Sequence, residues 1–256
     1  MPTHLSLDDH VAALVHSGGV LRDAAARAGL DAPVPTCPTW DVRTLVIHQG
    51  TVHRWAAATL RGQDDHDTEE SRAEAERAPH LLAWFSAGLE ALVSTIRTTS
   101  DDATARTFLN DAPPPRRFWA RRQAHETTIH SADAVAAMLG QWPATSDLAV
   151  RPELAADGID ELLCGFITRR NGTPPAAEPL TMVVATDDTG HAWTVRSAGR
   201  SFTTTTGAAE DADATLSGTA GQLYFGLWNR ADEITVRGRH DAVELWRSRV
   251  RVRWGG

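Results

Sequence analysis

Residues 121–133 place a carboxylate and an imidazole four positions apart in a segment of helical character, with the sequence Arg-Arg-Gln-Ala-His-Glu-Thr-Thr-Ile-His-Ser-Ala-Asp. At about 100° per residue, Glu126 and His130 differ by roughly 40° in azimuth and stack one turn apart on a helix. Asp133 follows on nearly the same face, where its carboxylate can accept the free ring N–H of His130 and fix the tautomer. This spacing can hold a divalent metal.

The same segment begins with His125-Glu126 and therefore invites comparison with the H-E-x-x-H helix of zinc proteases. That motif needs histidines at positions i and i+4, whereas position 129 is Ile. His125 and His130 are instead five positions apart, roughly 140° around a helix, and we expect them to point in different directions. The coherent pair is Glu126 with His130, which needs a third ligand from elsewhere in the chain.

The best third ligand is His48, which lies in another apparent helix. Residues 42–55 carry apolar side chains at helical spacing, and Asp41 is the expected N-cap. His48 falls on the apolar face, where an imidazole needs a hydrogen bond or a metal. Spacing alone leaves open a metal-free, hydrogen-bonded core histidine, and His53 as the substitute ligand. We expect His10, His16, His53, His125 and His191 to be surface or packing residues, although His53 is the most credible substitute for His48.

Helical patterns that could bring these side chains together cover about 5–30, 42–55, 69–97 and 121–139. After Trp142-Pro143 the pattern changes: strands are expected at 181–185, 192–196, 201–206 and 213–216, and helices near 154–168, 220–228 and 242–250. The predicted class is α+β. We expect a four-helix bundle over 1–145 and a small α+β domain over 146–256.

Bulk properties exclude several partners. The formal charge is −8 and no Lys/Arg run is present, which argues against nucleic-acid binding. The chain has neither an apolar stretch of about 18 residues nor a signal-peptide pattern, so we expect no membrane partner and a cytoplasmic location. Cys37 and Cys164 form no close-spaced metal or redox motif, and neither is a convincing nucleophile. If thiol chemistry occurs, we expect the thiol to arrive as a cosubstrate.

Two blocks of the N-terminal part resemble the mycothiol-dependent maleylpyruvate isomerase family, a DinB-like group. The first is Pro-Thr-Cys-Pro-Thr-Trp-Asp at 35–41, which continues through the His48 helix to Ala56; the second is R-R-x-A-H-E-x-x-x-H-x-x-D-A at 121–134. More loosely, residues 216–230 and on to Arg251-Val252 resemble the small C-terminal domain of that family, which is similar to sterol-carrier-type α/β folds.

The resemblance implies a DinB-like four-helix bundle in which His48, Glu126 and His130 bind zinc and Asp133 supports them. One departure is Gln49-Gly50-Thr51, which replaces the more apolar continuation expected after the histidine. Differences on the substrate side are therefore expected.

Two histidines and one carboxylate leave a zinc position open, which is typical of a catalytic site. A thiol bound there would become a thiolate near neutral pH, able to add to an activated alkene or to displace a leaving group. The resemblance implies mycothiol as the cosubstrate of an enzyme that transfers sulfur to, or isomerises, an electrophilic small molecule. Arg121, Arg122 and Arg230 are candidates for holding an acidic group of the substrate, with Arg122 and Arg230 favoured; the alternative for each is ordinary surface charge.

Two other classes of function remain open. A metal-dependent hydrolase would use the open position to activate water, but no additional general base is clearly placed in the sequence. A non-catalytic small-molecule binding protein would hold an apolar ligand in the sterol-carrier-like domain, with the metal structural or absent. The sequence predicts neither the acceptor substrate nor the oligomeric state.

Overall fold

The structure is a computed structural model whose described residues divide into two compact units. The described residues are 5–109, 112–169, 179–198 and 201–250. The first unit consists of Ser6–Phe108 and Ala112–Leu148. The second begins at Ala149 and also takes in Leu5 and Leu109. The predicted α+β class is confirmed, because the first unit is helical and the second carries a five-stranded mixed sheet with helices.

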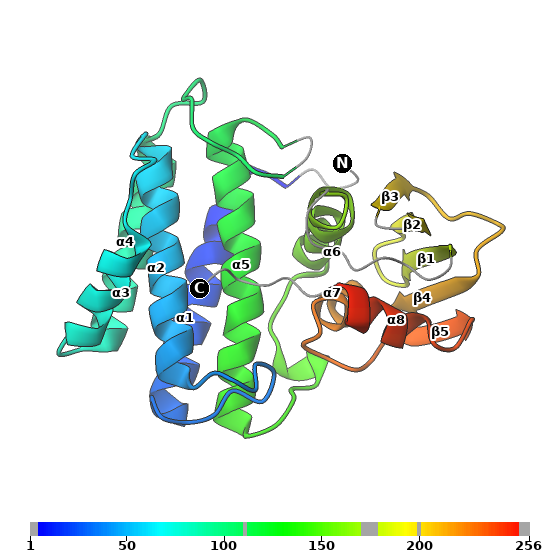
Figure 1. Ribbon diagram of the computed structural model, residues 1–256, viewed down its shortest axis with the longest axis horizontal. Helices are drawn as coiled ribbons and strands as arrows, with labels where there is room; N and C mark the ends of the chain where they lie inside the picture. Colours follow the sequence, from blue (N-terminus) through cyan, green and yellow to red (C-terminus); the bar gives the residue numbers. More distant parts are fainter. Residues whose placement is uncertain (1–4, 110–111, 170–178, 199–200, 251–256) are drawn as a thin grey trace. The chain divides into compact units, whose positions relative to one another are not determined.

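Four long helices make up most of the described part of the first unit, and α1, α2 and α5 run side by side in blue to green in Figure 1. These helices are α1 (Leu7–Ala28), α2 (Val42–Leu60), α4 (Leu81–Thr98) and α5 (Pro115–Leu139). Their starts are encoded locally. The Asp41 carboxylate accepts the Thr44 N–H at 2.7 Å and so caps α2. Pro115 opens α5, where the missing N–H needs no helical partner.

The single helical stretch expected over 69–97 is broken into two helices. α3 (Thr68–Arg77) ends before Ala78, which is extended with φ −66° and ψ 124°, and α4 starts at Leu81. The cause is Pro79, since the ring of a proline disfavours the helical region for the preceding residue. The polar α3 packs on α2 beside the four-helix arrangement.

Helix α5 differs from the others because every residue from Phe118 to Ala137 is buried, charged side chains included. A helix with no exposed face over this length must provide partners for each polar group that it buries. This demand points to α5 as the element that carries the site. In the part of the chain that the structure describes, no helix is both long and apolar enough to cross a membrane.

The second unit contains a sheet with the strand order β3-β2-β1-β4-β5. Its strands are β1 (Leu180–Thr186), β2 (Ala192–Ala198), β3 (Ser201–Thr206), β4 (Ala214–Gly218) and β5 (Thr235–Gly238). Its α-helices are α6 (Pro152–Asp160), α7 (Ala220–Leu227) and α8 (Ala242–Arg249), with a π-helical turn over Glu161–Phe166. β1 pairs antiparallel with β2, the next strand in the chain, and parallel with β4. The edge strand β5 was not predicted, because none of its residues is buried and it has no apolar alternation to read. Arg251 and Val252, part of the family resemblance, lie outside the described residues.

Candidate metal centre

The predicted ligands His48, Glu126 and His130 converge inside the bundle, with one donor atom of each within 4.8 Å of the others. The Oε1 of Glu126 lies 3.4 Å from the Nε2 of His130 and 3.7 Å from the Nε2 of His48. These separations exceed the usual hydrogen-bond length of about 2.7–3.2 Å. Zinc bonds of about 2.0–2.2 Å in a tetrahedral set place neighbouring donor atoms roughly 3.4 Å apart. The geometry therefore suits a shared metal.

The chemistry of the donor set also fits a cation. All three side chains are buried, and the Oε1 of Glu126 accepts no hydrogen bond from any described residue. Burial of a carboxylate oxygen that accepts no hydrogen bond costs roughly a few kcal/mol, unless a cation binds to that oxygen. Two imidazoles and a carboxylate are ligands that zinc commonly takes. The residues present therefore fit the metal that the family resemblance implies.

Each candidate ligand on α5 contacts a second side chain that holds it in place. Nη2 of Arg122, one turn before Glu126, donates to the carboxylate Oε2 at 2.7 Å. The Nδ1–H of His130 donates to Asp133 at 2.8 Å, which leaves Nε2 directed at the donor cluster. Asp133 in turn accepts the hydroxyl of Thr36 at 2.6 Å. Asp133 thus contacts the ring nitrogen of His130 that faces away from the donor cluster, and its role in supporting a metal ligand stays a prediction.

The charges of the site depend on these contacts. Burial alone raises the pKa of Glu126, but His130, His48 and Arg122 outweigh it and hold that pKa well below its usual range. Burial is the main cause that lowers the pKa of His48. Burial also opposes protonation of His130, yet its hydrogen bond to Asp133 and the nearby negative charge of Glu126 raise its pKa. The metal-free site therefore combines a stabilised carboxylate with one histidine whose protonation is easier than that of an ordinary imidazole.

Trp40 forms an aromatic wall of the site that the motif spacing did not reveal. Its ring lies 5.7 Å from that of His130 at an interplanar angle of 21°, and 4.9 Å from that of His48. The turn that carries it is fixed by backbone hydrogen bonds, including Val34 N–H to Trp40 O at 3.0 Å. Thr36 and Trp40 both belong to the first family-like block, which was the only signal that could have found them.

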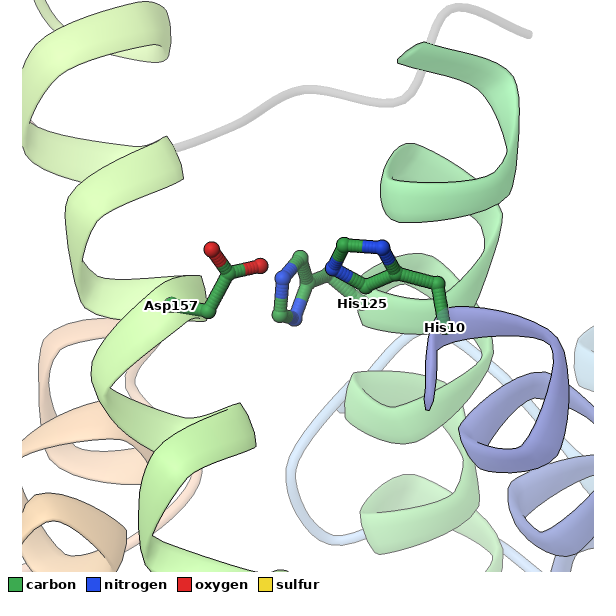
Figure 2. Close-up of side chains that lie close together, drawn as sticks. All are labelled: His10, His125 and Asp157. Atoms are coloured by element: carbon green, nitrogen blue, oxygen red, sulfur yellow. The ribbon is translucent and has the colours of Figure 1, made fainter. Parts of the chain in front are cut away.

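His125, although next to Glu126, is not part of this cluster. Its ring lies 6.2 Å from that of His10 on α1, in an edge-to-face arrangement, and Figure 2 shows the two imidazoles together. Asp157, also labelled there, comes from α6 of the second unit. The expected divergence of His125 and His130 agrees with this placement.

The other predicted residues lie in different surroundings. His53, the alternative third ligand, is fully buried and bonds to Gln49 and Thr127. Arg121 is buried on α5. Arg230 belongs to the second unit, where its Nη1 donates to the Trp228 carbonyl at 2.9 Å. Cys37 and Cys164 are not joined in a disulfide, and each is partly exposed.

The fold and the donor cluster define a class: a helical-bundle protein with a buried His-Glu-His set, followed by a small mixed-sheet unit. Two family models match the chain. The model of the mycothiol maleylpyruvate isomerase N-terminal domain matches residues 11–135, and that of the corresponding C-terminal domain matches residues 153–252. The chain belongs to the mycothiol maleylpyruvate isomerase family, so the resemblance inferred from the sequence blocks is confirmed.

Solved structures agree with this assignment at the level of the fold. A crystal structure of the mycothiol-dependent maleylpyruvate isomerase shares 14% identity with this chain, and a histidine-to-alanine mutant of that enzyme shares 13%. Each comparison covers 92% of this chain and 95% of the solved chain, with a TM-score of 0.61. A comparison with curated proteins found no match.

Proposed function

We propose that this protein is a metal-dependent thiol enzyme that uses mycothiol, or a related low-molecular-weight thiol, to transfer sulfur to or isomerise an electrophilic small molecule. The observation that carries the proposal is the convergence of His48, Glu126 and His130 on one buried point, in a chain of this family. Zinc is the proposed metal, because histidine and carboxylate donors at these separations suit a tetrahedral site. A cytoplasmic location remains a prediction.

When bound, a divalent metal would leave a coordination position open and favour the thiolate form of a thiol. The chain's own residues prepare that position. Arg122 holds one oxygen of Glu126, so the carboxylate presents the other. Asp133 fixes the tautomer of His130. The Trp40 ring shields the histidines and offers an apolar surface to a substrate.

We propose different roles for the two favoured arginines. Arg122 already contacts a ligand carboxylate and is buried, so its effect on the reaction is expected to pass through Glu126. Arg230 is half-buried and remains our proposal for the group that holds an acidic function of the substrate.

The proposal is tested first by metal analysis of protein purified without chelators, together with calorimetric titration of mycothiol into metal-loaded and metal-stripped samples. One metal per chain and thiol binding that requires it would support the thiol enzyme. Metal without thiol binding would favour a hydrolase that activates water. Absence of both would favour a small-molecule binding protein.

The ligand set gives the first prediction. His48→Ala, Glu126→Ala and His130→Ala should each lose the metal while they retain the helical circular dichroism of the bundle, because each removes one of three protein donors. His125→Ala is the matched control, since it removes a buried imidazole beside Glu126 that faces α1. It should keep its metal. Normal metal content in all three ligand variants would eliminate the site.

A further inference from the structure

Three buried side chains on the helices of the candidate ligands form a closed triangle of hydrogen-bonding distances. The Nε2 of Gln49 lies 3.0 Å from the hydroxyl of Thr127 and 2.9 Å from the Nε2 of His53. The Thr127 hydroxyl is 2.9 Å from the same His53 nitrogen. All three side chains are nearly or fully inaccessible to solvent. Gln49 directly follows the ligand His48, and Thr127 directly follows the ligand Glu126.

The proton positions in this triangle follow from the donors available. The Gln49 amide N–H donates to the Thr127 hydroxyl, and the Thr127 O–H donates to the Nε2 of His53. This arrangement needs a neutral His53 that carries its proton on Nδ1. Burial favours that state, because it lowers the pKa of His53 to about 3. The triangle is thus a set of directional bonds that does not change near neutral pH.

Stability alone does not account for these residues. The Oε1 of Gln49 and the Nδ1 of His53 have no hydrogen-bond partner among the described residues, and each is buried. Buried polar groups that are only partly satisfied are usually less stable than apolar side chains of the same shape. Position 49 is also where the family resemblance leads one to expect an apolar residue. Residues that lower the stability of the fold and lie next to a functional site often have a role in that site. We therefore look for the role of Gln49 and His53 in the candidate metal centre.

The triangle spans the two helices that provide the ligands. Gln49 and His53 belong to α2 with His48, and Thr127 belongs to α5 with Glu126. Elsewhere along the same pair of helices, Trp55 and Trp119 meet edge-to-face at 4.9 Å, an apolar contact that tolerates sliding better than hydrogen bonds do. The hydrogen bonds therefore fix the α2–α5 spacing at the level of the ligands.

We propose that Gln49, His53 and Thr127 form a clamp that sets the separation of His48 from Glu126, and through it the affinity and coordination geometry of the bound metal. These are positioning residues, since Gln49 and Thr127 act through the ligands that they directly follow and His53 bonds to both of them. The inference rests on the proposed metal centre. It also explains why a polar residue, Gln49, stands where the family resemblance leads one to expect an apolar one.

Two neighbouring threonines of α5 provide a matched test. Thr127→Val removes the hydroxyl of the clamp with almost no change in shape. Thr128→Val makes the same change one position on, where the hydroxyl instead donates to the Ala124 carbonyl at 2.7 Å and lies 2.8 Å from the Ser17 hydroxyl of α1. The measurements are the Kd for zinc by chelator competition, the visible absorption of the cobalt-substituted protein, and urea unfolding of the metal-free protein.

Thr127→Val should weaken zinc binding about tenfold and shift the cobalt absorption bands, as is typical when support of a metal ligand is lost. Thr128→Val should lower the stability of the metal-free protein and leave both metal readouts at wild-type values. Thr127→Ser, which keeps the hydroxyl, should restore the wild-type Kd and spectrum. Gln49→Met serves as the second clamp variant if Thr127→Val does not fold, and should show the same metal defects.

The two proposals fail in different ways. Wild-type zinc affinity and cobalt absorption in the clamp variants would overturn the clamp and leave the metal centre intact. A wild-type protein that binds neither zinc nor cobalt would overturn the centre and the clamp together. Equal metal defects in the Thr127 and Thr128 variants would also overturn the clamp, because the effect would then be general loosening of α5.

Discussion

Arg122 and Glu126 form a buried ion pair one helical turn apart, in which the charge of the arginine compensates the carboxylate before any metal is present. Arg122→Met should weaken the Kd for zinc by about 10- to 100-fold, because Glu126 would lose the donor that orients it. The metal-free protein should lose about 3–5 kcal/mol of stability, since one buried charge would be left unpaired. Chelator competition and urea unfolding measure the two effects.

Arg116 is the control for that variant, because it lies on the same helix but bonds to the Ile96 and Arg97 carbonyls and to Asp101. Arg116→Met should lower stability without a change in zinc affinity. If Arg122→Met bound zinc as tightly as the wild type, the arginine would have no part in orienting the carboxylate.

His53 predicts a pH dependence of folding. Burial lowers its pKa to about 3, whereas the unfolded chain takes up the proton near pH 6.5. Between these values the unfolded state binds more protons, so stability present above pH 6.5 is lost as the pH falls. From pH 7 to pH 5 this single group should remove about 2 kcal/mol.

Urea unfolding of metal-free wild type and His53→Gln at both pH values measures this contribution, since glutamine does not titrate. The variant should lose about 2 kcal/mol less than the wild type over the same interval. Parallel losses in the two proteins would show that His53 is protonated in the folded state or is exposed.

At the scale of elements, the contact between α2 and α4 depends on a glycine. A Cβ at Gly50 would lie 2.2 Å from Cζ3 of Trp84, whose ring is held by the Arg54 guanidinium 3.6 Å from its centroid. Gly50→Ala should therefore destabilise the protein by about 1–3 kcal/mol, despite the better helix propensity of alanine.

Gly19 of α1 provides the comparison, because a Cβ there meets no atom within 4 Å. Gly19→Ala should stabilise the protein by about 0.5–1 kcal/mol through helix propensity alone. Thermal unfolding of the two variants and the wild type measures the change in stability that each substitution causes. A similar response from both would mean that Trp84 moves aside at little cost.

The elements that sequence reasoning located are those with a clear period or a clear terminus. The helix around His48 was readable from its apolar face and from Asp41, and the strands β1 and β2 from β-rich runs with turn residues between them. The break at Ala78 was missed although Pro79 was visible, because the helical composition on both sides outweighed one proline. β5 gave no signal, since its pairing with β4 depends on the sheet rather than on its own residues.

For the whole molecule, helical spacing relates the candidate ligands of one helix, and the sequence shows only some of the groups that contact them. Glu126, His130 and Asp133 are related by helical spacing, which a sequence shows directly. Thr36 donates to Asp133 although the two residues are 97 positions apart in the chain. Trp40 contacts His130 from a turn, and the periodicity of the sequence does not predict the geometry of a turn. Arg122 is one helical turn from Glu126 in the sequence, but the burial of their ion pair is not evident there. The sequence therefore predicts that Arg122 binds an acidic group of the substrate, and it does not predict the ion pair.

The clamp and the donor cluster tie together two helices that are distant in the chain, since Gln49 and Thr127 are 78 positions apart. A metal shared by α2 and α5 would act as a reversible cross-link around a loop of that length, and such a link restricts the unfolded chain as a disulfide does. Part of the free energy of unfolding would then come from metal–ligand bonds, which a chelator can remove. The lifetime of each molecule would depend on the free zinc around it, so scarcity of zinc would shorten the survival of the protein as well as its activity.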